Sequence, residues 1–326
     1  MGSGPQPCVS VAESAALTRR VTRLSVGFAV LLSLIKAGAW ISSGSVAMLA
    51  SMADSGLDMI AAAATFFAVR YAAAPPDHDH GFGHGKAEAF ASLIQAGLVF
   101  ASAALVGREA VARLLHPSPV THEVADLVVM VASTALTLLL IRAQTSVLRS
   151  ARSVAVTSDR THYIADVAAN LAAFAGIGAS LLLANPVPDA LAGIAVTAWL
   201  VWGAVGVFRA ASVELMDQEL DQGQRDQIIA LMRVDPMVRD VHELRTRASG
   251  PYIHLQMHAE LDPNLTLAEA HQVMVRAERR VLEAFPMADI MIHPDPRGQA
   301  EAHGGPFAEI HGAEADMAAP APVAAR

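Results

Sequence analysis

Two segments of the chain place metal-ligand side chains at a helical spacing. In "SMADSGLDMI", Asp54 and Asp58 are four residues apart, and in "SDRTHYIADVAAN", His162 and Asp166 have the same spacing. Residues four apart lie one turn apart on the same face of a helix. If the two faces meet, three carboxylates and one imidazole form a four-ligand set, which suits a small divalent metal such as Zn²⁺.

A third group of such residues lies in a short polar segment. "DHDHGFGHGKAE", which begins at Asp77, packs three histidines and two aspartates into its first eight residues. Nitrogen and oxygen ligands of this kind suit Zn²⁺, and imidazole also suits iron, cobalt and nickel. The sequence predicts either a metal site or a solvated histidine-rich loop that binds metals loosely.

The segments that must position these residues are unusually apolar. The chain has 326 residues, of which 53% are hydrophobic and 17% charged, whereas soluble domains carry about 25% charge; its mean hydropathy is +0.40. A membrane helix needs about 20 apolar residues. Six runs qualify, too many for a soluble bundle of buried helices: Leu24–Ile41, Val46–Val69, Ala89–Val111, Ala125–Leu148, Ala165–Leu183 and Ala190–Phe208.

Asp54 and Asp58 lie inside the second of these apolar runs. A charged side chain at the centre of a bilayer costs about 3 kcal/mol or more, so such residues usually serve a function. Two like charges one turn apart also repel, and a bound cation would remove that repulsion. The alternative is that one acid caps a helix or pairs with an arginine. Asp159, beside Arg160, is expected at the membrane interface and outside the ligand set.

Basic residues predict the orientation of the spans. Arginines precede the first run and crowd the fourth connection, while the first and fifth connections, "SSGS" and "NPVPD", hold no Lys or Arg. The excess of positive charge in cytoplasmic loops predicts a multi-pass protein with both termini and the histidine-rich segment in the cytoplasm. The net charge of −8 argues against a nucleic-acid partner, and the single Cys8 excludes a disulfide framework.

The pattern changes after Met216. "DQGQRDQIIALMRV" and "LTLAEAHQVMVRAERRVLEAF" have helical periodicity, with Thr266 as an N-cap, while "VRDVHELRTRASG", "YIHLQMHAEL" and "ADIMIHPDP" are typical of strands. The order αββαβ predicts a small α+β domain. We therefore expect an N-terminal tail (1–19), a six-helix transmembrane domain (20–214), a cytoplasmic metal-binding domain (215–297) and a disordered tail (298–326).

Four segments together resemble the cation diffusion facilitator family, most closely its bacterial zinc and ferrous-iron efflux branch. They are "SGSVAMLASMADSGLDM", "DHDHGFGHGKAE", "SDRTHYIAD" and "HELRTRASGP", and the similarity runs from about Arg20 to Pro296. The resemblance implies a homodimer in the cell inner membrane, with six spans and a metallochaperone-like cytoplasmic domain. It also implies exchange of cytoplasmic Zn²⁺ for protons, with Zn²⁺ as both transported and regulatory ion; Fe²⁺, Cd²⁺, Co²⁺, Ni²⁺ and Mn²⁺ remain open.

The resemblance assigns ligands to three sites. It implies a transport site of Asp54, Asp58, His162 and Asp166, a second site of Asp77, His80 and His84, and a binuclear site across the dimer interface of His242, His258, His271, His293 and Asp295. Pro294 stands where close relatives have a polar residue. Lys86 resembles a family lysine that pairs with the acid at Asp217. His254, His303 and His311 match no family ligand.

These features predict a proton-coupled antiporter that works by alternating access. Every ligand must be deprotonated to bind a metal, and histidine titrates near neutral pH, which makes His162 the natural proton carrier. Metal binding by the cytoplasmic domain would regulate transport. One alternative is a membrane sensor that binds Zn²⁺ without moving it. An intramembrane metalloenzyme would need an open ligand position and a general base, and the sequence has no HExxH motif.

Overall fold

The computed structural model describes residues 11–43, 46–115, 124–183 and 187–298. Within these ranges a few side chains, including that of Asp54, lie outside the description, as do His303 and His311 in the C-terminal segment. The chain divides into two compact units: the first holds Met1–Gln218 with Ala248–Tyr252, and the second holds Glu219–Arg247 with Ile253–Arg326.

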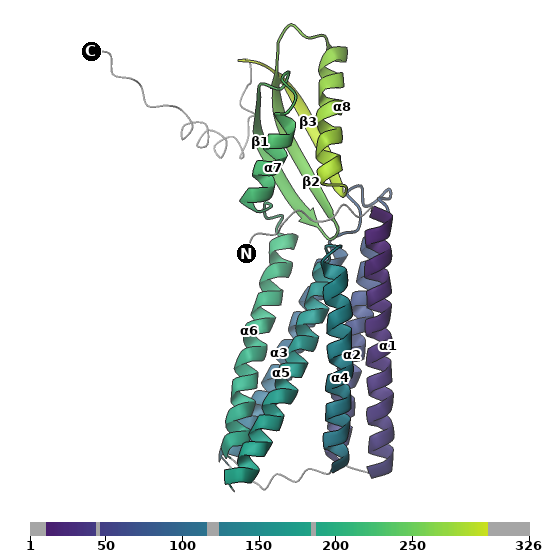
Figure 1. Ribbon diagram of the computed structural model, residues 1–326, viewed down its shortest axis with the longest axis vertical. Coiled ribbons are helices and arrows are strands. Elements are labelled where there is room, and N and C mark those ends of the chain that lie inside the picture. Colours follow the sequence, from purple (N-terminus) through teal and green to yellow (C-terminus); the bar gives the residue numbers. More distant parts are fainter. Residues whose placement is uncertain (1–10, 44–45, 116–123, 184–186, 299–326) are drawn as a thin grey trace, which may run out of the picture. The chain divides into compact units, whose positions relative to one another are not determined.

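Six long helices form the first unit. They are α1 (Val11–Ser43), α2 (Val46–Ala72), α3 (Ala87–Leu115), α4 (Val124–Leu148), α5 (Val154–Leu183) and α6 (Val187–Leu215). Among the described residues, α1, α3, α4, α5 and α6 are long and apolar enough to cross a membrane, and α2 is described only in part. The six apolar runs of the sequence are therefore six helices that lie side by side (Figure 1).

Two helices begin earlier than the apolar runs that predicted them. α1 begins at Val11, inside the segment expected to be a tail, because its first turns are rich in good helix formers such as alanine, glutamate and leucine. α5 begins at Val154 and not near Ala165. As a consequence, Asp159 and His162 lie within a continuous helix and not before its N-terminus.

Small residues allow the helices of the first unit to pack closely. α5 and α6 pack together and α3 packs on both, through a buried cluster to which Ala103, Ala165 and Ala204 contribute. On α6, Gly193 lies so close to α3 that an added Cβ would come within 2.8 Å of the Ala110 methyl group. Close approach of this kind drives helix association in lipid, where no hydrophobic effect operates between helices. It holds α5 against α3 and α6.

The second unit has the predicted order αββαβ. It comprises α7 (Gln222–Met232), β1 (Asp240–Ser249), β2 (Tyr252–Leu261), α8 (Leu267–Ala284) and β3 (Ala288–Pro296). The sheet order is β1-β2-β3, and α8 is the crossover between the parallel strands β2 and β3. Thr266 is the N-cap of α8 in a capping box with Glu269, as the sequence predicts.

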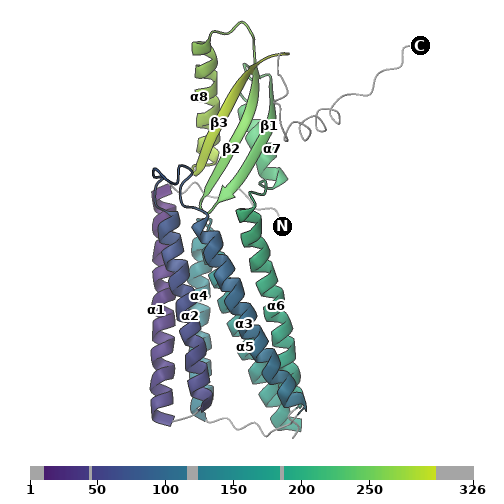
Figure 2. The ribbon, with the colours of Figure 1, turned by 180° about the vertical axis from the view of Figure 1, so that it is seen from behind.

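One face of the sheet carries the apolar core. Alternate residues of β2 are buried, among them Leu255, Met257 and Ala259, and α7 and α8 lie together on one face of the sheet (Figures 1 and 2). The parallel register pairs His258 with His293 and Glu260 with Asp295. Because side chains alternate along a strand, these partners project to the opposite face. None of the described helices of this unit covers that face (Figure 2).

An ionic contact links α8 to the end of α7. Asp235, whose side chain is 7% exposed, accepts hydrogen bonds from the Nε of Arg276 (3.1 Å) and the backbone N–H of Met237 (3.1 Å). Burial alone would raise the pKa of Asp235, but the Met237 N–H and the guanidinium of Arg276 hold it below its usual value.

Candidate metal centres

The first cluster lies between α2 and α5. The Nε2 of His162 is 2.9 Å from an oxygen of Asp58 and 3.6 Å from an oxygen of Asp166, and one ligand atom of each residue lies within 4.8 Å of the others. In a tetrahedral Zn²⁺ site with bonds of 2.0–2.1 Å, ligand atoms lie about 3.3 Å apart. The three side chains therefore need only small shifts to share one ion.

The cluster is largely enclosed within the helices. The side chains of His162, Asp58 and Asp166 are 10%, 18% and 36% exposed. The i, i+4 spacing on α5 places His162 and Asp166 together, as the sequence predicts. Asp54 belongs to α2, one turn before Asp58, but its side chain lies outside the described residues, so its part in the ligand set stays a prediction.

Asp159 is deeply buried among the helices of the first unit, and its expected place at the membrane interface stays a prediction. It is 1% exposed. Gln95 of α3 donates its Nε2–H to one carboxylate oxygen (3.1 Å) and Gln144 of α4 to the other (2.7 Å). The apolar run predicted a later start for the fifth span because hydropathy counts Asp159 as polar. A hydropathy scale takes no account of the two glutamine amides that donate hydrogen bonds to this carboxylate.

The same two amides extend the network to α1 and α2. Gln95 also donates to the hydroxyl of Thr65 on α2 (2.8 Å), and Gln144 donates to the hydroxyl of Ser25 on α1 (3.1 Å). Side chains of five helices thus meet around one carboxylate. Asp159 lies three residues before His162, so the network holds the ligand-bearing face of α5 from one turn away.

A second buried acid holds the start of α5. Glu88, at the beginning of α3, is 2% exposed. Its carboxylate accepts hydrogen bonds from the hydroxyl of Ser153 (2.6 Å) and the backbone N–H of Ala155 (3.4 Å). A carboxylate at this position satisfies free N–H groups and complements the positive end of the helix dipole. Glu88 therefore ties the N-terminus of α5 to α3. In the sequence, Glu88 is a single acid next to an apolar run, and nothing in that pattern predicts its role.

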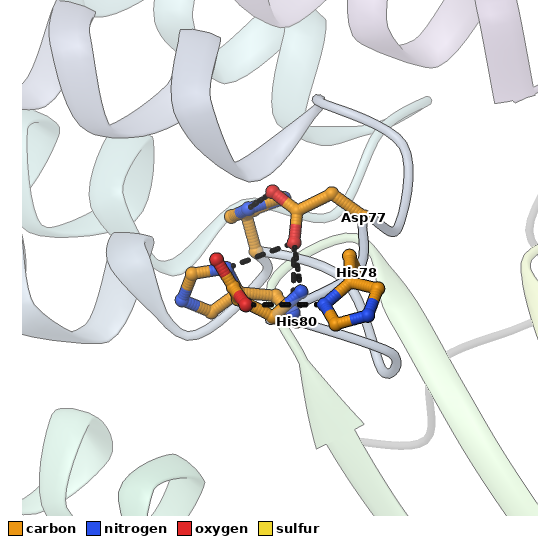
Figure 3. Close-up of polar contacts among 5 residues, drawn as sticks. Asp77, His78 and His80 are labelled. Carbon is orange, nitrogen blue, oxygen red and sulfur yellow. Dashed lines mark hydrogen bonds and ion pairs between the residues drawn. The ribbon is translucent and has the colours of Figure 1, made fainter.

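The loop cluster is centred on Asp77, and Figure 3 shows its contacts. One oxygen of Asp77 lies 3.1 Å from Nδ1 of His80, and the other lies 3.1 Å from Nε2 of His84. His84 is 3% exposed at its side chain, whereas His80 is 51% exposed. The three predicted residues therefore meet at one carboxylate. His78 and Asp79 contact each other, are almost fully exposed and lie outside the cluster.

Local backbone geometry holds Asp77 in place. Its carboxylate accepts the backbone N–H groups of His80 (2.7 Å) and Asp79 (3.0 Å), an Asx turn that orients the side chain. These N–H groups, the His80 one first, lower the pKa of Asp77, so the carboxylate is ionised and ready to bind a cation. Gly83, with φ of 79°, makes the reversal that returns His84 to the cluster.

The Lys86–Asp217 pair implied by the family resemblance is formed within the first unit. The Nζ of Lys86 is 2.9 Å from one oxygen of Asp217 and 3.1 Å from the other. Both side chains are about two-fifths exposed, with values of 37% and 38%. Exposed pairs contribute about 0–1 kcal/mol, so this contact orients the end of α6 more than it stabilises the fold.

The third cluster lies on the uncovered face of the sheet. One oxygen of Asp295 is 2.9 Å from Nδ1 of His258 and 3.2 Å from Nε2 of His242. The other oxygen is 3.3 Å from Nε2 of His293. Pro294 pairs with Ala259 in the register, which leaves His293 and Asp295 on the same face. Four of the five predicted residues thus meet in one chain.

The fifth predicted residue, His271, lies elsewhere. It is exposed on α8, and the described residues contain no metal-ligand group that includes it. Its assignment to a site across the dimer interface stays a prediction. His254 makes its own pair with Asp289 (3.0 Å) outside the cluster, consistent with its match to no family ligand.

Glu243 is a member of this neighbourhood that the sequence did not reveal. Its carboxylate lies 3.7 Å from Nε2 of His258 and is 14% exposed. Alternation along β1 would place Glu243 on the face opposite His242. The backbone of Glu243 has φ of 50°, however, and the burial pattern slips by one residue there. The position of Glu243 depends on this local backbone conformation, which the pattern of residue types along β1 does not reveal.

Apolar helices that carry buried acids, joined to an α+β unit with a histidine cluster, define a membrane protein that handles metal cations. The family model for the cation efflux transmembrane domain matches residues 22–216, and that for the cation efflux protein cytoplasmic domain matches residues 220–297. The chain therefore belongs to the cation diffusion facilitator family and is a membrane-embedded cation efflux transporter.

Individual relatives agree over most of the chain. The cation-efflux pump FieF of Shewanella oneidensis is 38% identical over 282 residues, 84% of this chain and 93% of the relative. That of Cronobacter sakazakii is 36% identical over 280 residues, 86% and 93% of the two chains. The metal-bound C-terminal domain of the CzcD transporter from Thermotoga maritima is 26% identical, with a TM-score of 0.24, and covers 25% of this chain and 100% of that one.

Proposed function

We propose that the protein exports Zn²⁺ from the cytoplasm across the cell inner membrane in exchange for protons. The ion binds Asp58, His162 and Asp166, with Asp54 as the fourth ligand. The observation that carries the proposal is the convergence of two carboxylates on one imidazole nitrogen, at 2.9 and 3.6 Å, from helices of 27 and 30 residues, each longer than the roughly 20 residues that a membrane requires. Ionisable side chains inside a membrane are energetically costly, and they commonly mark ion pathways.

Ligand chemistry supports Zn²⁺ as the cargo. Imidazole and carboxylate at separations near 3.3 Å suit its tetrahedral preference. The same ligands accept Fe²⁺, Co²⁺, Ni²⁺, Cd²⁺ or Mn²⁺, because ligand type restricts a metal without choosing it. Proton exchange follows from the same atoms. Each of them binds either a metal or a proton, so a site that releases its metal outside can return with protons.

The two other clusters support regulation from the cytoplasmic side. The loop cluster is exposed at His80 and Asp77, and the sheet cluster lies on a face that no helix of its unit covers. In a homodimer with both termini in the cytoplasm, His271 of a second copy would complete the sheet site. Binding there would link the protomers when the cytoplasmic metal concentration rises and would favour transport.

A flux experiment in proteoliposomes tests the proposal. Purified protein is reconstituted with an internal metal indicator and an internal pH indicator, and Zn²⁺ is supplied with and without a pH gradient. We expect Zn²⁺ uptake coupled to opposite proton movement in the wild type and its loss in Asp58→Ala. Glu109→Ala is the matched control, because Glu109 is a half-exposed acid on α3 away from the cluster.

The result also separates transport from sensing. A membrane sensor would bind Zn²⁺ at all three clusters without flux, and normal flux in Asp58→Ala would refute the assignment of the intramembrane site. A parallel series with Fe²⁺, Co²⁺, Ni²⁺, Cd²⁺ and Mn²⁺ at equal free concentration identifies the preferred ion.

A further inference from the structure

Glu243 holds an unusual backbone conformation in the middle of a strand. Its φ of 50° lies in the left-handed region, which glycine adopts freely and other residues adopt only against a steric penalty. The burial pattern of β1 slips at the same point, so that His242 and Glu243 are both half-buried in succession. A slip of this kind re-aims a side chain, and here it directs Glu243 to the face that carries the metal cluster.

His258 has a different carboxylate at each of its ring nitrogens. Nδ1 lies 2.9 Å from an oxygen of Asp295, which is also 3.2 Å from His242. Nε2 lies 3.7 Å from an oxygen of Glu243. The shared oxygen of Asp295 places Nδ1 on the side where His242 and Asp295 converge. Glu243 occupies the other side of the ring, so it faces His258 and not the centre of the cluster.

We propose that Glu243 is a positioning residue for the cytoplasmic metal cluster: its carboxylate, now 3.7 Å from Nε2 of His258, moves within hydrogen-bond distance when a metal binds Nδ1 and then accepts the Nε2–H. A neutral imidazole carries one N–H, and the nitrogen that carries it cannot bind a metal. In this structure Nδ1 is the nitrogen that donates, to an oxygen of Asp295 at 2.9 Å. A metal that takes the lone pair of Nδ1 requires the N–H to be on Nε2, where the Glu243 carboxylate is the nearby acceptor. Metal-bound histidines usually donate their second nitrogen to such a partner.

The contact between Glu243 and His258 gives a reason for the strained backbone at Glu243. A glycine at position 243 would satisfy the backbone but would leave the ring of His258 free to turn. The carboxylate supplies a contact that offsets the steric penalty and strengthens when the metal draws His258 into place. The inference rests on the proposed metal-binding role of this cluster, and it adds a residue that acts through a ligand.

Cobalt binding to the full-length protein tests this role. In detergent micelles, a parent that carries Asp58→Ala and Asp77→Ala removes a ligand from each of the other two clusters, so the visible absorption of Co²⁺ reports the cytoplasmic one. Glu243→Gly and Glu243→Gln are titrated beside the parent, and thermal unfolding is followed without metal. Asp289→Asn is the matched control, since Asp289 pairs with a histidine of the same sheet outside the cluster.

We expect both Glu243 variants to weaken Co²⁺ binding by about 10- to 100-fold, the usual effect of losing such a partner, while Asp289→Asn leaves it unchanged. Glu243→Gly should at the same time raise the unfolding temperature, because it relieves the backbone. A purely structural role predicts the same gain in stability without the loss of binding: a glycine variant that is more stable and binds Co²⁺ as tightly as the parent overturns the proposal.

A further variant separates this inference from the function on which it rests. His258→Ala should abolish Co²⁺ binding in the same parent. If it does so and Glu243→Gly has no effect, the cluster binds metal and only the role of Glu243 is refuted. If the parent itself binds no Co²⁺, the cytoplasmic site is refuted, and the positioning role with it.

Discussion

The buried network around Asp159 allows a quantitative test with two substitutions of similar size. Asp159→Leu removes both acceptor oxygens from the hydrogen bonds of 3.1 and 2.7 Å that Gln95 and Gln144 donate. Asp159→Asn keeps one acceptor oxygen and replaces the other with a donor. If the network organises the helices, the leucine variant should be much less stable than the asparagine variant.

The magnitude follows from the partners that remain. Each amide keeps its second bond, to Thr65 or to Ser25, so leucine costs the two bonds to Asp159 and not the full desolvation of the amides. Hydrogen bonds to charged groups contribute about 1.5–3 kcal/mol in proteins, while bonds between membrane helices average about 0.6 kcal/mol with a maximum near 1.7. Two bonds near the upper membrane value give about 3 kcal/mol.

Asparagine should be tolerated because the network has spare acceptors. Among the described residues, the Oε1 atoms of Gln95 and Gln144 have no hydrogen-bond partner. Rotation of one glutamine amide presents its oxygen to the N–H group of the introduced asparagine, so that position 159 keeps a hydrogen bond to each glutamine. We expect a cost below about 1 kcal/mol for two neutral bonds in place of charge-assisted ones.

Thermal unfolding in detergent, followed by tryptophan fluorescence, measures both variants. For a domain of about 200 residues, 1 kcal/mol shifts the midpoint by about 2–4 °C. Leucine should therefore lower the midpoint by about 6–12 °C and asparagine by less than about 4 °C. Equal midpoints for the two variants would refute the hydrogen-bond argument, and a leucine variant as stable as the wild type would show that the network does not hold the helices.

Three further predictions concern turns, caps and charge. Gly85→Ala should destabilise the first unit by about 1–3 kcal/mol, because its Cβ would lie 2.0 Å from the carbonyl oxygen of Ser249 in the same unit, whereas Gly97→Ala, with nothing within 4 Å, should be neutral or stabilising in a thermal melt. Thr266→Ala should cost about 1 kcal/mol and speed hydrogen exchange in the first turn of α8, because it removes the capping box. The ionised side chain of Asp235, whose pKa is lowered in the folded protein, should stabilise the second unit fully at pH values above its unfolded pKa of about 3.9, and progressively less as the pH falls through its lower folded pKa. Hydrogen exchange between pH 6 and 3 should show this loss of stability in the wild type and not in Asp235→Asn.

Most of the architecture is predictable from local patterns. Six apolar runs predict six helices, and alternation with turn signals predicts αββαβ, because both depend on the period of one element at a time. The starts of the helices are less predictable. Hydropathy places the beginning of the fifth span near Ala165, since it cannot register that Gln95 and Gln144 neutralise the cost of Asp159 inside the bundle.

The metal clusters show the same division between local and tertiary information. The spacing of His162 and Asp166 on one helix is fixed by the helical repeat, so the sequence alone predicts that these two side chains meet. Their distance to Asp58 depends on how α2 packs against α5, which spacing within a helix cannot supply. Glu243 was missed for a related reason: its side chain reaches His258 only because the backbone has φ of 50°. Candidate ligands are thus predictable from residue type and period, whereas the buried residues that contact their helices and side chains, Asp159, Glu88 and Glu243, become visible only when the partner elements are in position.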